Sequence, residues 1–80
     1  DVMPLVSALR HRAETIRREE LARARKKLGP LNAEQEAALE AATSAIVNKL
    51  LHAPTTQLKE LSKNGNAAEA LQLARKLLGL

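Results

Sequence analysis

Few side chains in this sequence could carry out catalysis. His52 is a candidate general base and Lys49 a candidate amine nucleophile. No acidic residue lies next to His52, and the second histidine, His11, is far away along the chain. Lys49 would need burial to lose its proton, yet it falls off the apolar face of its segment. We therefore expect His52 to pack or cap at a helix end and Lys49 to be exposed.

Metal ligands are equally sparse. Glu34, Glu36 and Glu40 could form an acidic metal-binding face, but acidic residues also favour the first turns of a helix, and we expect that role here. The absence of cysteine excludes disulfides and thiolate metal sites. The common phosphate-binding, zinc-binding and nucleophile motifs do not occur either. No catalytic, cofactor-binding or metal-binding residue is therefore predicted.

Composition indicates a helical domain that needs a partner. The chain has 80 residues, no aromatic residue and a formal charge of +4. The single core of a domain this small stabilises the fold only weakly, so we expect the chain to form an oligomer. Without aromatic residues the core must be aliphatic, which favours helix packing, and the stacking platforms of single-strand nucleic-acid binders are missing. No apolar run approaches a membrane span and no signal peptide is visible, so a cytoplasmic location is compatible.

The apolar spacing predicts an all-α fold of about four helices, one long, one medium and two short, which pairs into a helical dimer. The long helix is expected over residues 4–28, with Pro4 in its first turn and Gly29-Pro30 as its stop. The pattern Asp1-Val2-Met3-Pro4 does not resemble a natural start, so the sequence is expected to be part of a longer chain.

The remaining helices are placed by capping residues and a proline. Asn32 is expected to form a capping box with Gln35 and to begin the medium helix, which should end at about residue 51 or 52 because Ala53 precedes a proline. Pro54 should then open a short helix. A second capping box at Asn66 should begin the last helix.

Apolar stripes on the first two helices are candidate interaction surfaces. The stripe of the medium helix is the wider one, so this helix is expected to be the most buried. A two-fold dimer uses the same patch on both chains. A charge at Ile46 is expected to break folding and pairing together. The candidate dimer-interface residues are Leu9, Ile16, Leu39, Ile46, Val47 and Leu50.

The long helix also carries a basic strip. Between Arg10 and Lys27 there are eight basic and three acidic side chains, a local balance of +5. This strip could be a solvated helix face, with Glu14–Arg18 and Glu19–Arg23 as i,i+4 ion pairs, or it could contact RNA phosphates. The candidate RNA contacts are Arg17, Arg18, Arg25 and Lys26.

Three segments carry a family resemblance. They are residues 4–10 (PLVSALR), residues 16–21 (IRREEL) and residues 47–55 (VNKLLHAPT), of which the last is the most specific. In order and spacing they resemble the C-terminal dimerisation domain of glutamyl-tRNA reductase. The resemblance covers nearly the whole chain.

The resemblance implies that residues 1–80 form one homodimerisation domain of a larger oxidoreductase. Enzymes of this family use NADPH to reduce glutamyl-tRNA to glutamate-1-semialdehyde in tetrapyrrole (porphyrin) biosynthesis. Their catalytic cysteine and their NADPH-binding domain lie elsewhere in the protein, so this chain is expected to be non-catalytic and to hold no cofactor of its own. The expected partners are a second copy of the chain and, for the parent enzyme, glutamyl-tRNA. A basic helical module that binds tRNA is the alternative function.

Overall fold

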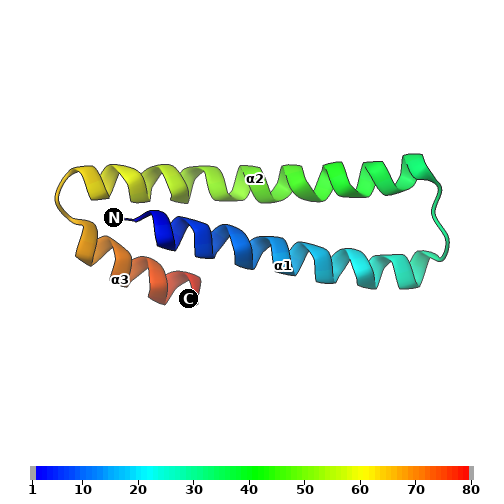
Figure 1. The fold of residues 1–80 in the computed structure, drawn as a ribbon, viewed down its shortest axis with the longest axis horizontal. Helices are drawn as coiled ribbons and strands as arrows, with labels where there is room; N and C mark the ends of the chain where they lie inside the picture. Colours follow the sequence, from blue (N-terminus) through cyan, green and yellow to red (C-terminus); the bar gives the residue numbers. More distant parts are fainter. Residues whose placement is uncertain (1, 80) are drawn as a thin grey trace.

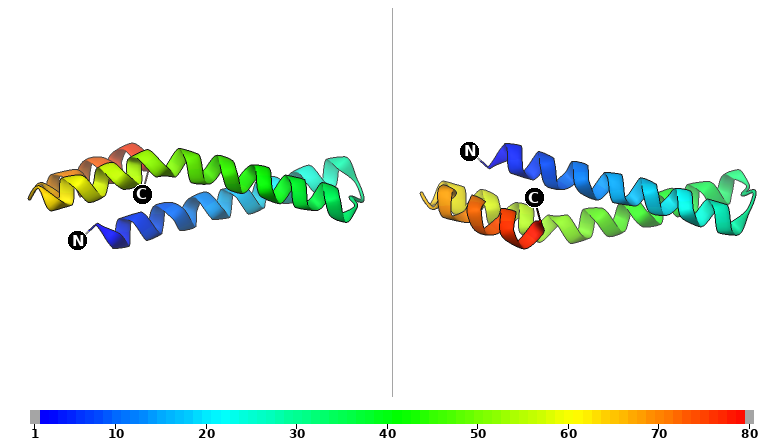
Figure 2. Two further views of the ribbon diagram at one scale, coloured as in Figure 1. Left: turned by 90° about the horizontal axis from the view of Figure 1, so that it is seen from above. Right: turned by 90° about the horizontal axis from the view of Figure 1, so that it is seen from below.

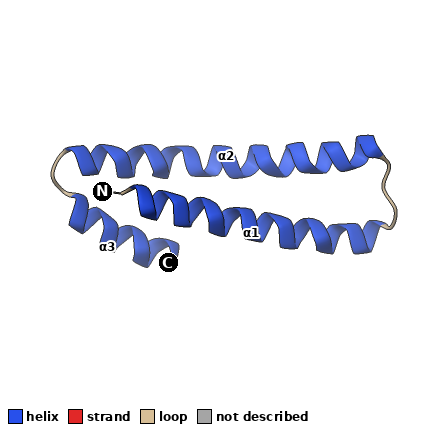
Figure 3. Cartoon of the chain, viewed as in Figure 1, coloured by secondary structure: helices blue, strands red, loops and turns tan. Residues whose placement is uncertain are grey.

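The computed structural model describes residues 2–79, with Ala67 described by its backbone alone. Two long antiparallel helices form a hairpin, and a short third helix folds back against its open end (Figure 1). The helices are α1 (Met3–Leu28), α2 (Ala33–Lys63) and α3 (Ala67–Leu78). The described residues contain helices and turns without a strand (Figure 3), so the predicted all-α class is confirmed.

Helix α1 forms as the sequence predicts. Pro4 lies in the first turn, where its missing N–H costs no helical hydrogen bond. The helix ends at Leu28, and the capping residue Gly29 has a backbone φ of 77° and donates its N–H to the Arg25 carbonyl at 3.0 Å. Basic residues in the last turn complement the negative end of the helix dipole.

The two predicted capping boxes have different outcomes. The Asn32 side chain accepts a hydrogen bond from the Gln35 N–H at 2.8 Å, and the Gln35 side chain accepts one from the Asn32 N–H at 3.0 Å, which confirms the first. The second is wrong, because Asn66 makes no side-chain capping bond. Asn66 follows the turn at Gly65 with φ −101° and ψ 26°, whereas a capping side chain needs the extended backbone that Asn32 has.

The expected break at Pro54 is also wrong, so the structure has three helices where four were predicted. Pro54 lies inside α2, which continues to Lys63. A proline within a helix removes one backbone hydrogen bond and costs about 3 kcal/mol. Leu51 and Leu58 lie on either side of it in sequence and are both buried. Burial of these leucines on one continuous helical face offsets the local cost.

The core lies at the open end of the hairpin, where all three helices meet. It contains Val2 and Leu5 from the start of the chain, Leu58 from α2, and Ala70 and Ala74 from α3. Toward the tip of the hairpin the described chain has only two layers, one helix on the other. Helix α2 is not the most buried one, because Ile46 and Leu50 of its stripe remain exposed.

The molecule is long and thin. It measures 51 × 19 × 15 Å, and α1 and α2 cross obliquely along its length (Figure 2). Its radius of gyration is 15.9 Å, against roughly 12 Å for a compact domain of this length. A hairpin of this shape leaves much of its apolar surface without cover from its own chain.

A candidate dimer interface

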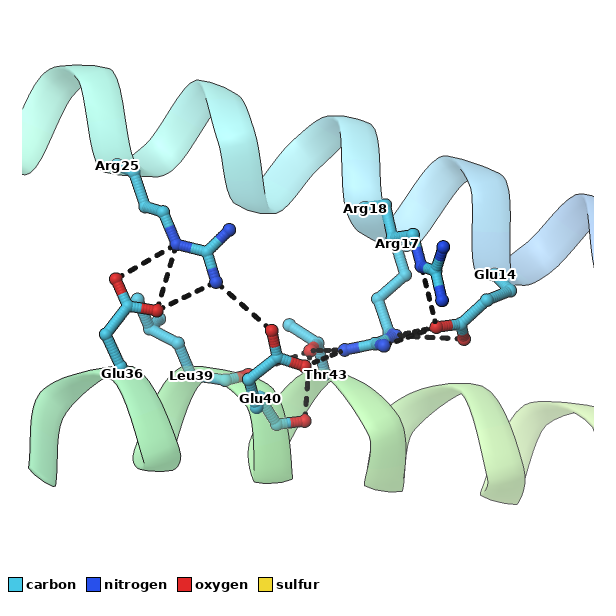
Figure 4. Close-up of polar contacts among 8 residues, drawn as sticks. All are labelled: Glu14, Arg17, Arg18, Arg25, Glu36, Leu39, Glu40 and Thr43. Carbon is cyan, nitrogen blue, oxygen red and sulfur yellow. Dashed lines mark hydrogen bonds and ion pairs between the residues drawn. The ribbon is translucent and has the colours of Figure 1, made fainter. Parts of the chain in front are cut away.

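An ionic network joins the two arms of the hairpin (Figure 4). The Arg17 guanidinium donates to Glu14 on its own helix and to Glu40 on α2, the latter at 2.8 Å. It also donates to the Thr43 hydroxyl at 3.2 Å. The Arg17 side chain is only 9% exposed. The network therefore fixes how α1 and α2 are placed along each other near their middle.

Arg25 extends the same network toward the tip. Its Nε donates to both carboxylate oxygens of Glu36 at 3.0 Å, and its guanidinium also reaches Glu40 at 3.1 Å. Glu40 thus lies between two arginines of α1. The hydrogen bond from Arg17, followed by that from Arg25, holds the pKa of the Glu40 carboxyl below its usual value.

The candidate RNA contacts divide into two groups. Arg17 and Arg25 are engaged within the hairpin, whereas Arg18 and Lys26 lie exposed on its surface. The predicted Glu14–Arg18 pair is present at 3.4 Å. Arg23, predicted to pair with Glu19, instead contacts Glu20 at 3.1 Å. The basic strip is therefore partly neutralised by the fold.

The other polar candidates do not converge on a site. Glu36 and Glu40 bind arginines, and Glu34 is exposed in the first turn of α2. His52 and Lys49 are exposed. Among the described residues, no three His, Cys, Asp or Glu side chains gather as a metal site would require. Within residues 2–79, no helix is both long and apolar enough to cross a membrane.

An apolar groove runs between α1 and α2 beside the ionic network. This central groove has a volume of about 440 Å³. Its lining is aliphatic at the centre, where Ile16, Ile46 and Leu50 are 50%, 57% and 69% exposed. The residues that line it are Ala13, Ile16, Arg17, Glu20, Thr43, Ile46, Val47 and Leu50.

A second apolar groove lies between α2 and α3. This terminal groove has a volume of about 200 Å³. Leu73 and Leu77 of α3 form its outer edge and are 59% and 75% exposed, while Leu61 of α2 is less exposed. The residues that line it are Pro54, Gln57, Leu58, Leu61, Ala70, Leu73, Ala74, Leu77 and Leu78.

The structure separates the predicted interface residues. Four of them line the central groove, namely Ile16, Ile46, Val47 and Leu50. Leu39 is half-buried one turn away on α2, and Leu9 is buried within the chain, which leaves it little surface for a partner. Sequence reasoning missed the terminal groove. The sequence does carry a signal for it: α3 has more apolar positions than one face of a short helix can bury.

The exposed surface is larger than a compact chain would have. The accessible area is 5964 Å², about 1,200 Å² more than the roughly 4,700 Å² expected for a compact monomer of this mass. A standard protein–protein interface removes about 800 Å² from each partner. The excess is therefore large enough for a stable interface.

Comparison with known proteins identifies the family. Residues 1–80 match the family model described as glutamyl-tRNAGlu reductase, dimerisation domain. The chain belongs to this family. Curated relatives that match the whole chain are named glutamyl-tRNA reductases, and the dimerisation domain corresponds to only part of their length.

Three relatives illustrate the match. Glutamyl-tRNA reductase of Chloroflexus aurantiacus is 41% identical over 80 residues, which is 100% of this chain and 18% of that protein. Glutamyl-tRNA reductase 2 of Koribacter versatilis is 38% identical over 80 residues, again 100% of this chain and 18% of the relative. That of Rubrobacter xylanophilus is 43% identical over 79 residues, or 99% and 18%. This dimerisation domain thus spans about a fifth of the length of its relatives. No solved structure matches it.

Proposed function

We propose that this chain is the part of a glutamyl-tRNA reductase through which two subunits associate. Its family supports this function, and one observation on the molecule carries it. A mainly apolar groove centred on Ile16, Ile46 and Leu50 lies open on a hairpin that has about 1,200 Å² of surface beyond that of a compact monomer. Contiguous exposed apolar surface of this kind favours burial against another protein.

In this proposal, the central groove is the main contact surface. Ile46 and Leu50 project from α2 and Ile16 from α1, with Val47 at the floor between them. Leu39 lies one turn before Thr43 on α2 and is half-buried, and Leu9 is buried within the chain. Full burial of an Ile or Leu side chain contributes roughly 1.5–3 kcal/mol. In a two-fold dimer the same residue of each copy lies in the interface, so each contribution occurs twice.

The chemistry of the parent enzyme is proposed to lie in its other domains. That enzyme would use NADPH to reduce glutamyl-tRNA to glutamate-1-semialdehyde for tetrapyrrole synthesis, in the cytoplasm where charged tRNA is found. The present 80 residues would supply no catalytic group and no cofactor contact. Their contribution would be to hold two catalytic subunits together.

The test is the solution mass of the chain across a dilution series. Light scattering with refractive-index detection suits a protein without Trp or Tyr. We expect twice 8.7 kDa for the unmodified chain. Ile46 is 57% exposed in the single chain, so Ile46→Glu should leave the chain folded, in contrast to the expectation from the sequence. It should weaken association about 100-fold or more, because two apolar side chains per dimer are replaced by buried charges.

Ala45→Glu provides the matched control. Ala45 is exposed on α2 next to Ile46 in sequence but points away from the central groove, so a charge there should leave the dimer intact. Circular dichroism of each variant would show that helix content is retained. A chain that remains at 8.7 kDa at every concentration would contradict the proposed function.

A further inference from the structure

The turn between α2 and α3 places an asparagine directly before a glycine. It connects the two helices at the open end of the hairpin (Figure 1). Asn64 is the C-cap residue of α2, and Gly65 follows it with a φ of 80°. The Gly65 N–H donates to the Ser62 carbonyl. The Asn66 N–H donates to the Leu61 carbonyl at 3.1 Å, and the two bonds form a Schellman motif. This motif needs a left-handed backbone after the C-cap, so the fold itself favours glycine at that position.

A glycine in this place makes the preceding asparagine side chain reactive. The backbone nitrogen of the following residue can attack the carbonyl carbon Cγ of the asparagine, and a Cβ on that residue would hinder the approach. The space around Gly65 is open, since a Cβ placed on it would meet no atom within 4 Å. Asn64 is exposed, and its side chain makes no hydrogen bond to another described residue. The asparagine amide is therefore free to meet the glycine nitrogen.

The turn restrains these two residues only weakly. The hydrogen bond from the Gly65 N–H to Ser62 is 3.4 Å long, beyond the usual range of about 2.7–3.2 Å. Because the attacking nitrogen must first lose this proton, a weak hydrogen bond opposes the reaction little. Ring closure also requires Asn64 to leave its present ψ of 11°. Residues at the end of a helix open locally at a small free-energy cost, so this rotation is accessible in the folded chain.

We infer that Asn64 is a site of spontaneous deamidation and that this modification loosens the attachment of α3. In the first step a bond forms between the Gly65 nitrogen and Cγ of Asn64. The bond from Cγ to the amide nitrogen breaks, and ammonia leaves with the proton from Gly65. Water then opens the resulting succinimide ring. Opening at Cγ gives aspartate, whereas opening at the main-chain carbonyl gives isoaspartate, in which the main chain runs through the side-chain carbons. Neither step needs an oxidant, a reductant or an enzyme.

The other asparagines of the chain are better protected. Asn32 is held in its capping box. Asn48 lies inside α2, where its side chain accepts a hydrogen bond from Arg10 at 2.9 Å. Asn66 is exposed in the same turn as Asn64, but the residue after it is alanine. Comparison of Asn64 with Asn66 therefore tests the effect of the following glycine at nearly equal exposure.

Isoaspartate in this turn would change how α3 meets the core. Ala70 and Ala74 of α3 are buried against Leu58 of α2, and the turn determines where they lie. An additional main-chain carbon would misalign both hydrogen bonds of the Schellman motif. The product also carries a negative charge at the negative end of the α2 dipole. Glu60 and Lys63 near the end of α2 supply one charge of each sign, so the additional carbon has the larger effect. We expect α3 to separate more often from α2 and the terminal groove to open.

Mass spectrometry of the aged chain tests the modification. The chain is kept in mildly alkaline buffer at physiological temperature and then digested with trypsin, which releases residues 64–75 as one peptide. Fragmentation of this peptide shows which asparagine has become one mass unit heavier, and enzymatic methylation detects isoaspartate. We expect Asn64 to be converted at least about ten times faster than Asn66, because no Cβ hinders ring closure at Gly65. The peptide of residues 28–49, which contains the other two asparagines, should change even less.

Hydrogen exchange tests the effect on α3, with Asn64→Gln as the matched control. Glutamine keeps the amide, but its longer side chain closes the ring far less readily. After ageing, amide hydrogens of residues 70–78 should exchange faster in the unmodified chain, and those of the Asn64→Gln chain should not. Equal conversion of Asn64 and Asn66, or none at Asn64, would overturn the proposed site. Conversion at Asn64 with unchanged exchange in α3 would overturn the proposed loosening. Neither result bears on whether two copies associate, so the proposed function is tested separately.

Discussion

Arg17 of α1 donates a hydrogen bond at 2.8 Å to the carboxylate of Glu40 on α2, across 23 positions of sequence. Arg25 reaches the other oxygen of the same carboxylate at 3.1 Å. The two arms of the hairpin are thus joined by polar contacts at their middle and by apolar contacts at the open end, where the core lies. The central groove lies between these two regions.

This ionic network predicts a stability that depends on pH. The hydrogen bond from Arg17 holds the pKa of the folded Glu40 carboxyl below its usual 4.5, and a hydrogen bond from Arg17 lowers the pKa of Glu14 likewise. Carboxyls with a lower pKa in the folded state stabilise the fold above the unfolded value and lose that contribution as pH falls through the folded value. The unfolding temperature should therefore stay level from pH 7 to about pH 5 and drop below about pH 4.5.

Substitution of Glu40 checks the assignment. Glu40→Gln should lower the unfolding temperature at pH 7 and make its drop at acid pH shallower, as followed by circular dichroism at 222 nm. Glu60→Gln, on the exposed surface of the same helix, is the control and should change neither. Equal effects of the two substitutions would argue against the network as the source.

The same truncation should affect different properties at two leucines of α2. Leu58 is buried in the core, so Leu58→Ala should destabilise the folded chain by about 2–5 kcal/mol. Leu50 is 69% exposed, so Leu50→Ala should leave the fold of one chain nearly unchanged and weaken association instead. Urea unfolding in an Ile46→Glu background, which separates folding from pairing, measures the first effect, and a dilution series measures the second.

Replacing the internal proline should stabilise the helix. Pro54→Ala restores an N–H that can donate to the Leu50 carbonyl and should raise the free energy of unfolding by up to about 3 kcal/mol. Pro30→Ala, in the turn between α1 and α2, should instead cause a small loss because the unfolded chain gains freedom. A lower stability for Pro54→Ala would mean that the ring, which lines the terminal groove, contributes more than the missing hydrogen bond costs.

Substitution of asparagine by alanine should have unequal effects at the starts of α2 and α3. Asn32→Ala removes a side-chain cap and should cost about 1 kcal/mol. Asn66→Ala removes no capping bond and should cost clearly less. Thermal and urea unfolding of the two variants at equal concentration provide the comparison. Similar losses would indicate that Asn66 caps α3 in solution.

Local chemistry explains which parts of the fold could be predicted. The capping box at Asn32 and the stop at Gly29 depend on neighbouring residues alone, so the sequence pattern was sufficient. Pro54 was misjudged because its local preference is outweighed by burial of Leu51 and Leu58, which depends on the path of the whole chain.

The candidate site shows the same division. Helical periodicity predicted a stripe containing Ile46, Val47 and Leu50, but it could not tell which members α1 would cover. The terminal groove depends on how α3 folds back over α2, and no local pattern encodes that path. Likewise, Arg17 was predicted to be one base of a strip that is either solvated or in contact with RNA, because its partner Glu40 is brought near only by the hairpin.

The turn at the tip of the hairpin is a place where the chain could lengthen without disturbing the core. The turn at residues 29–32 lies at the opposite end of the molecule from the core (Figure 1). Adding seven residues to each arm there would lengthen the hairpin by about 10 Å without moving the core or Pro54. The reach of this arm could therefore change in evolution independently of the surface that we propose to pair.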